Sequence, residues 1–330
     1  MSRRARIAFR LAGLALGVGA LTYLYRALSD ELDPAAVLPV LPATLLVVPW
    51  FALPLTAATE AWRVLVPRAE RPPFAAAAWL SWLGLAVNWL LPVATIGGEI
   101  VKLALIRRRG ASGAVLAASL IVDKTLQVVT QIVFVLGGAA LFAACTGELA
   151  WHWAGLSGLA AVTAGLALFV AGQRAGMFGR LAAVLKYGGA AGLTESALRL
   201  DEALVASWGR RRDLIRGCIW RLAFRMLLAG EVAIVLVWAG HPATVLEVLV
   251  LESITQGARM SAFIVPAGIG MQEGALIAAG LALGVPLEAL VALALVKRLR
   301  EVIVAVPALV LWQVGEARHA RRLASGGAGI

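Results

Sequence analysis

The chain has 330 residues, of which 61% are hydrophobic and 15% are charged, and its mean hydropathy is +0.86. This composition is typical of a polytopic membrane protein and excludes an ordinary water-soluble domain. The formal net charge of +11 does not indicate a nucleic-acid partner, because the basic residues gather in loops and tails between apolar segments.

A helix that crosses the hydrocarbon core of a bilayer needs about 20 mostly apolar residues. Segments with all or part of this character lie, in chain order, at residues 7–25, 35–58, 74–92, 114–145, 152–171, 219–239, 245–266, 275–285 and 287–313. The first resembles a signal peptide, but no small-residue cleavage site follows it, so we expect an uncleaved helix. We predict a single integral membrane domain over residues 1–330.

The loop charges predict the topology. Lys and Arg gather at the N-terminus and in the stretches 63–71, 107–109, 173–212 and 318–322, whereas the loops 30–33, 147–151 and 240–244 contain none. By the positive-inside rule, both termini of this multi-pass chain are cytoplasmic. The polar stretch 172–216 is predicted to be a cytoplasmic amphipathic linker that lies at the membrane interface.

Two segments interrupt apolar sequence in the same way. The first reads Pro92-Val-Ala-Thr-Ile-Gly-Gly-Glu99, and the second, 174 positions later, reads Pro266-Ala-Gly-Ile-Gly-Met-Gln-Glu273. The same register aligns the pair Asp123-Lys124 with Lys297-Arg298. Matched Pro and Gly breaks in the two halves of a membrane protein point to a substrate site near the middle of the bilayer.

The loops around the two copies carry opposite charge. The loop before the first copy, 63–73, is basic, whereas 240–244 before the second contains no Lys or Arg. The first copy ends in the acidic stretch 147–149, and the second ends in the basic stretch 318–322. We therefore predict an all-α fold with an inverted repeat, whose halves are 74–145 and 245–315, and with two re-entrant or broken helices. Two unrelated helix breaks are the alternative.

Charged and glycine residues near the breaks form a candidate lipid-headgroup site. The first amides of a half-helix at membrane depth can bind an anion such as a phosphate, unless an acidic side chain only caps the helix. Each charge costs about 2.5–3.5 kcal/mol at the bilayer centre unless it is paired or hydrated. The predicted headgroup-binding residues are Gly97, Gly98, Glu99, Lys102, Asp123, Lys124, Arg259, Gly268, Gly270, Glu273, Lys297, Arg298 and Glu301, and Pro92 and Pro266 are the helix breaks.

The second copy carries the stronger excess of positive charge in the sequence. Lys297 and Arg298 can both pair with Glu301 along one helix, which leaves two cations without a partner and favours an anionic headgroup. We expect neutral replacement of Lys297 or Arg298 to abolish transport without loss of stability. Arg221 and Arg225 are predicted to snorkel at a cytoplasmic helix end.

The sequence offers no residue set for catalysis or metal binding. Cys145 and Cys218 stand far apart in the predicted topology, and the histidines His152, His241 and His319 are isolated. No nucleotide-binding glycine loop with the required spacing is present. We expect no catalytic residue, no metal and no cofactor, and therefore a protein that is not an enzyme.

These motifs resemble those of a known family. The stretches 88–109 and 118–127 are similar to the flippase-like family, also called the lysylphosphatidylglycerol synthase transmembrane region. The shared features are a proline, a Gly-Gly-Glu break, a basic residue three positions on and a later acidic-basic pair. Two residues depart from the common pattern: Lys102 stands where the family has Arg, and Asp123-Lys124 replaces Glu-Arg. Both changes keep the charge but weaken two-pronged phosphate contacts.

The second half, in the stretches 252–259, 272–274 and 296–301, more specifically resembles the HpnL membrane proteins associated with hopanoid gene clusters. This resemblance implies a bacterial inner-membrane protein whose partners are membrane lipids and which translocates or presents an anionic or hopanoid-related lipid. A homo-oligomer, or binding to proteins of a lipid pathway, is also open. The alternatives are a non-transporting scaffold of such a pathway and a lipid-modifying transferase.

Overall fold

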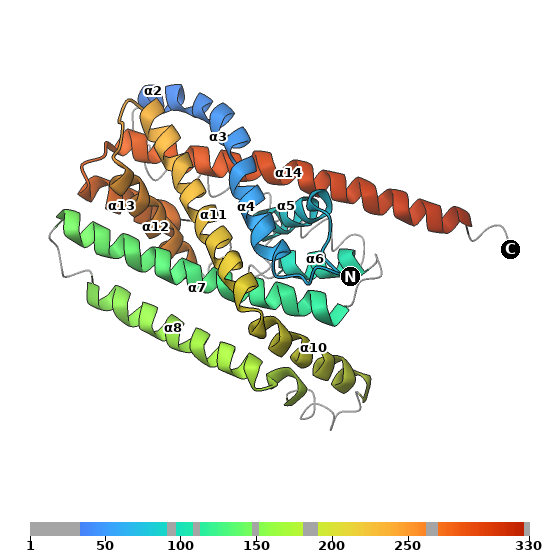
Figure 1. Ribbon diagram of the computed structural model, residues 1–330. Helices are drawn as coiled ribbons and strands as arrows, with labels where there is room; N and C mark the ends of the chain where they lie inside the picture. Colours follow the sequence, from blue (N-terminus) through green and yellow to red (C-terminus); the bar gives the residue numbers. More distant parts are fainter. Residues whose placement is uncertain are drawn as a thin grey trace.

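The computed structural model describes residues 34–90, 97–107, 113–146, 152–180, 191–261 and 270–326, and every regular element in these ranges is helical (Figure 1). The all-α class is therefore confirmed for the described residues. Pro92, Pro266, Gly268 and the predicted first helix lie outside them. The elements are α2 (Pro34–Val37), η1 (Leu38–Ala43), α3 (Thr44–Trp50), α4 (Ala52–Arg63), α5 (Phe74–Leu90), α6 (Gly97–Arg107), α7 (Gly113–Thr146), α8 (His152–Arg174), α10 (Ala191–Gly209), α11 (Arg211–Trp238), α12 (Val245–Ser261), α13 (Met271–Ala282) and α14 (Leu287–Gly326).

The first described crossing consists of short helical pieces, where the sequence predicted one helix over 35–58. Pro42 lies inside the 3-10 segment η1, and Pro49 lies inside α3. Proline has no N–H to donate and clashes with the preceding turn, so it disturbs the helical hydrogen bonding near these points. The stretch Leu38–Arg63 nevertheless stays long and apolar enough to cross a membrane.

Many large apolar side chains are exposed on the described surface, as expected for a membrane protein. Leu45 is 77% exposed and Leu168 is 74% exposed, whereas charged side chains such as Glu231 and Glu252 are buried. Within the described residues, Leu38–Arg63 and Gly113–Ala144 meet the length and hydropathy of a membrane span, and Phe74–Leu90 is apolar but shorter. Apolar side chains outside and polar groups satisfied inside are the arrangement that a bilayer favours.

The helices around the two breaks begin at matching positions. α6 begins at Gly97 and α13 at Met271, and α7 begins at Gly113 and α14 at Leu287, so both pairs of starts are 174 residues apart. α6 has 11 residues and α13 has 12. At about 1.5 Å per residue, neither helix reaches across the roughly 30 Å hydrocarbon core of a bilayer.

Helices of each half pack against helices of the other half, and we call these the exchanged contacts. α5 of the first half contacts α14 of the second, and α12 of the second half contacts α7 of the first. The central pair consists of α11 and of α4 together with the segment before it, and the two run antiparallel. Helices α7 and α14 also run in opposite directions across Figure 1. Three side-chain donors along the central pair fix this direction, from Trp238 to the Pro39 carbonyl (3.1 Å), from Trp50 to the Leu227 carbonyl (2.7 Å) and from Arg210 to the Leu65 carbonyl (2.7 Å).

The predicted linker 172–216 is not one separate segment. α8 continues to Arg174, and α11 already begins at Arg211. Between them, α10 packs against α7 and α8, with Leu204 buried in a cluster with residues of α7, while Leu198 and Val205 are exposed. The amphipathic pattern of this helix therefore serves packing on one side and leaves apolar residues on the other.

Candidate functional site

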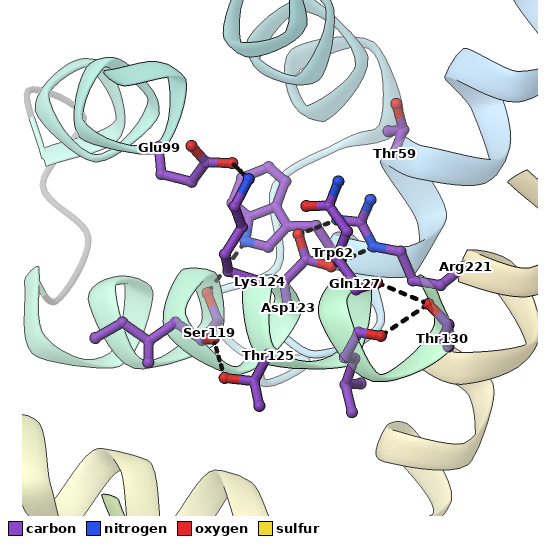
Figure 2. Close-up of polar contacts among 12 residues, drawn as sticks. Thr59, Trp62, Glu99, Ser119, Asp123, Lys124, Thr125, Gln127, Thr130 and Arg221 are labelled. Atoms are coloured by element: carbon purple, nitrogen blue, oxygen red, sulfur yellow. Dashed lines mark hydrogen bonds and ion pairs between the residues drawn. The ribbon is translucent and has the colours of Figure 1, made fainter. Parts of the chain in front are cut away.

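Glu99, near the start of α6, joins this short helix to α7. Its Oε1 atom lies 3.3 Å from the Lys124 Nζ atom (Figure 2). Its Oε2 atom accepts a hydrogen bond from the Asn88 Nδ2 atom at 3.3 Å, and the Asn88 Oδ1 atom accepts one from the Gly98 N–H at 2.9 Å. Asn88 of α5, rather than Glu99, therefore caps α6, and the Gly98 amide is already occupied.

Two glycines bring α6 against α5 and bury Lys102. A Cβ atom on Gly98 would lie 2.2 Å from the Gly84 carbonyl oxygen, and a Cβ atom on Gly84 would lie 2.5 Å from the Lys102 Cε atom. This close approach leaves Lys102 only 8% exposed. Its Nζ atom lies 5.5 Å from the centre of the Trp62 ring, and no carboxylate in the described part of the chain forms an ion pair with it. Attraction to an aromatic ring compensates only part of the desolvation of an ammonium group.

Asp123 of α7 pairs with Arg221 of α11 deep in the helix bundle (Figure 2). The Arg221 Nε atom donates to Asp123 Oδ1 at 2.9 Å, and its Nη2 atom donates to Asp123 Oδ2. One turn further along α11, the Arg225 Nη2 atom donates to the Gln127 carbonyl at 2.7 Å. Both arginines are buried, so the prediction that they snorkel at a helix end is wrong: α7 supplies acceptors that hold them inside.

In the second half, Glu273 occupies the position of Glu99. Its Oε2 atom accepts a hydrogen bond from the Gly270 N–H at 2.9 Å and so caps α13 itself, and its Oε1 atom accepts one from the Arg298 Nε atom at 2.6 Å. Arg298 also donates to Glu301 at 2.9 Å, and Arg259 of α12 donates to the other oxygen of Glu301 at 3.1 Å. The Glu273–Arg298 pair thus repeats the Glu99–Lys124 pair at the same 174-residue register.

Two further carboxylates, Glu252 and Glu231, pair with cations of α14. Lys297 pairs with Glu252 of α12. The sequence had suggested Glu301 as its partner. Arg300 lies 3.2 Å from Glu231 of α11, with its guanidinium 4.8 Å from the ring centres of both Phe51 and Trp89. Because Glu252 and Glu231 come from neighbouring helices, periodicity along α14 could not show them as partners.

The charged residues in the interior form two groups that differ in net charge. The second-half group has four cations, four carboxylates and no net charge: Arg259, Lys297, Arg298 and Arg300 with Glu231, Glu252, Glu273 and Glu301. The predicted excess of two cations in this half is therefore wrong. The first-half group has four cations and two carboxylates, so two positive charges are in excess. Its members are the cations Lys102, Lys124, Arg221 and Arg225 and the carboxylates Glu99 and Asp123.

Within the described residues, the predicted site thus separates into these two groups, one at α6 and α7 and one at α13 and α14. Six residues of these groups were not among the predicted site residues: Asn88, Arg221, Arg225, Glu231, Glu252 and Arg300. Most of them are charged residues inside predicted spans, and a charge in hydrocarbon implies a partner. A requirement that every such charge be matched would have identified Glu231 and Glu252.

The two groups approach each other across the contact of α7 with α12. The Gln131 Nε2 atom of α7 donates to the Gln256 carbonyl at 2.8 Å, and the Gln256 Nε2 atom donates to Glu252 at 2.7 Å. A polar connection therefore runs from α7 to the second-half group. In the described residues, no set of three or more His, Cys, Asp or Glu side chains is arranged to hold a metal ion.

A pocket of about 720 Å³ lies elsewhere, between the 176–180 turn and α10. Its lining includes Arg180, Leu198 and Asp201, and Asp201 accepts a hydrogen bond from the Gly179 N–H at 2.6 Å. It contains none of the predicted headgroup-binding residues.

A comparison with protein families finds one match that covers most of the chain. The family described as "Lysylphosphatidylglycerol synthase TM region" matches residues 10–308. No curated protein and no solved structure matches significantly. The match agrees with the apolar helical spans and with the resemblance identified in the first half of the sequence.

Proposed function

This chain belongs to the lysylphosphatidylglycerol synthase transmembrane-region family, and from that premise we propose that it is a lipid transporter of the flippase type. It is a membrane protein of a family concerned with lipid handling. In the proposal it resides in a bacterial inner membrane with both termini cytoplasmic, acts without catalysis or a cofactor, and moves an anionic or hopanoid-related lipid. The closer likeness to the HpnL proteins stays a prediction.

One observation carries the proposal: the repeated ion pair at the two helix breaks. Glu99–Lys124 and Glu273–Arg298 each connect a short helix to the long helix that follows, 174 residues apart. Ion pairs in hydrocarbon are expensive, and a pair that only stabilised the fold would often be replaced by apolar packing. Paired charges at matched breaks are the features expected of a path for a polar headgroup.

The proposed mechanism uses an inverted repeat, which the helix directions support. The antiparallel pairing of α4 with α11, and the exchanged contacts of α5 with α14 and of α12 with α7, are the arrangement expected for two halves related by an axis in the membrane plane. Tilting of one half against the other would open the polar interior to each face in turn. The lipid tail stays in the bilayer, so only the headgroup crosses the interior.

A scaffold of a lipid pathway is the second candidate. The observation that favours it is the neutral second-half group, in which every cation has a carboxylate partner within the chain. Such a closed set stabilises helix packing without any ligand. A scaffold predicts that lipid exchange between leaflets does not depend on the protein.

The two candidates differ in a reconstitution experiment. The full chain is incorporated into liposomes that contain a fluorescent phosphatidylglycerol, and a membrane-impermeant quencher reports the fraction of probe in the outer leaflet over time. We expect quenching to pass well beyond the outer-leaflet half in vesicles with protein, and to stop there in protein-free vesicles. Equal quenching in both preparations, with insertion verified, would rule out transport of this lipid and favour the scaffold.

A further inference from the structure

We infer that only the first half of the molecule recognises the ligand: Lys102 and Lys124 hold the phosphate of a lipid headgroup, and the second-half group is a structural set that takes no ligand. The inference rests on the proposed lipid transport and specifies which part of the repeat carries it. Four observations support it: the unpaired cation, the weaker ion pair, the charge balance and the closed geometry of the other half.

Lys102 is a buried cation that lacks a carboxylate partner among the described residues. Its side chain is held in place because Gly84 and Gly98 let α5 and α6 approach closely around it. A buried, unpaired ammonium group is unfavourable in the protein alone and becomes favourable when an anion reaches it. Lys102 follows Glu99 by three positions on α6, so both side chains lie on the same face of the helix.

Lys124 has a partner that an incoming phosphate can displace. The Lys124–Glu99 distance is 3.3 Å, with side-chain exposures of 28% and 19%, whereas Arg298 and Glu273 lie 2.6 Å apart with exposures of 15% and 7%. An ammonium group has three donors and no fixed plane, so it can turn from a carboxylate toward a phosphate oxygen. Arg298, in contrast, is held by two carboxylates at once.

The net charge of the two groups favours an anionic ligand, and it favours binding in the first half. The first-half group keeps two positive charges after its carboxylates are counted, and the second-half group keeps none. A phosphate offers several anionic oxygens, so it can bind two ammonium groups at once. Release of the ligand restores the Lys124–Glu99 pair, so the empty state is not left with both lysines unpaired.

At the equivalent point of the second half, the groups that could bind a phosphate already have partners within the chain. The Gly270 N–H is used by Glu273, the other Glu273 oxygen is used by Arg298, and both Glu301 oxygens are used by Arg259 and Arg298. A phosphate entering here would have to separate several short, buried ion pairs. Within the described residues, each cation of this group already has a carboxylate within ion-pair distance.

The test measures binding separately from transport. The purified full chain, in a detergent without phosphate, is titrated with a fluorescent phosphatidylglycerol, and anisotropy gives the Kd for the wild type and for Lys102→Gln, Lys124→Gln, Lys297→Gln and Arg199→Gln. Arg199 is a surface control because its ion pair with Glu195 is exposed. Loss of one charged phosphate contact should raise the Kd about tenfold or more for Lys102→Gln and Lys124→Gln, with little change in Tm.

We expect Lys297→Gln to lower the Tm while the folded fraction keeps the wild-type Kd, and Arg199→Gln to change neither. Wild-type affinity in both Lys102→Gln and Lys124→Gln, or weaker binding by Lys297→Gln at an unchanged Tm, would overturn the inference. Two competitors identify the source of the phosphate. Diacylglycerol with the same tails should not compete, and inorganic phosphate should compete only weakly; full competition by inorganic phosphate would overturn the lipid assignment.

The outcome is distinguishable from that of the proposed function. Lipid binding that depends on Lys102 and Lys124, without movement between leaflets in liposomes, would reject transport and keep the binding site. Transport that is unaffected by both substitutions would keep the transporter and reject this site.

Discussion

The two halves of the chain place an ion pair at the same point and surround it differently. In the first half, Glu99 and Lys124 form a partly exposed pair, and Lys102 is buried without an ion-pair partner among the described residues. In the second, Glu273 and Arg298 belong to a buried set in which every charge is matched. Positions in the same 174-residue register can therefore have different surroundings, because the partners from neighbouring helices decide whether a charge is already matched.

The largest expected effect tests the structural role of the second-half group. Lys297→Met leaves the fully buried Glu252 without its cation, and removal of one partner of a buried pair costs about 3–5 kcal/mol. Thermal unfolding followed by the loss of soluble, monodisperse protein measures the change. Arg199→Met at the exposed Arg199–Glu195 pair is the matched control. A stable Lys297→Met variant without transport would instead restore the prediction made from the sequence.

The next effect concerns the close glycine packing of α5 against α6. Gly98→Ala places a Cβ atom 2.2 Å from the Gly84 carbonyl, which is backbone and cannot rotate away. Overpacking of this kind costs about 1–3 kcal/mol, and it should also shift α6 and weaken phospholipid binding. Gly137→Ala in α7 is the control, since nothing lies within 4 Å of its Cβ position. Equal Tm values for the two variants would contradict the close packing of α5 and α6.

An exchange of side-chain type makes the second half resemble the first. Arg298→Lys keeps the charge but cannot hold Glu273 and Glu301 together as a planar guanidinium does. The loss of one charge-assisted hydrogen bond should destabilise the protein by about 1.5–3 kcal/mol at most. The reciprocal change, Lys124→Arg, should strengthen the pair with Glu99 and slow lipid exchange. Faster exchange in Lys124→Arg would contradict the displacement of Glu99 by the ligand.

The smallest effect on stability is expected at Glu99. Its pair with Lys124 is partly exposed, and such pairs contribute about 0–1 kcal/mol. Glu99→Gln keeps the shape of the side chain and its contact with Asn88 while it removes the competitor for Lys124. The Kd for phosphatidylglycerol should fall, as anisotropy would report, and the Tm should change little. Glu273→Gln, tested in parallel, should lower the Tm instead, because it leaves Arg298 with one carboxylate.

Several features followed from local sequence. Pro and Gly weaken a helix, so the sequence predicted breaks near Pro92 and Pro266; both prolines lie outside the described residues, between α5 and α6 and between α12 and α13. The 174-residue register predicted that Lys124 and Arg298 would occupy equivalent positions, and the helix starts at Gly113 and Leu287 agree with it. Apolar composition also predicted the two described segments that are long and apolar enough to cross a membrane, Leu38–Arg63 and Gly113–Ala144.

The ion-pair partners were decided by the packing of distant helices. Lys297 is 45 residues from Glu252, and Arg221 is 98 residues from Asp123. Helical periodicity reports only neighbours three or four positions away, which is why it paired Lys297 with Glu301 and left Arg221 at a helix end. The contacts of α11 with α7 and with α14 bring carboxylates of one helix to the arginines of the other. A charge in hydrocarbon must have some partner, and the sequence determined that need; only the tertiary fold selected which partner meets it, because that choice depends on distances between helices.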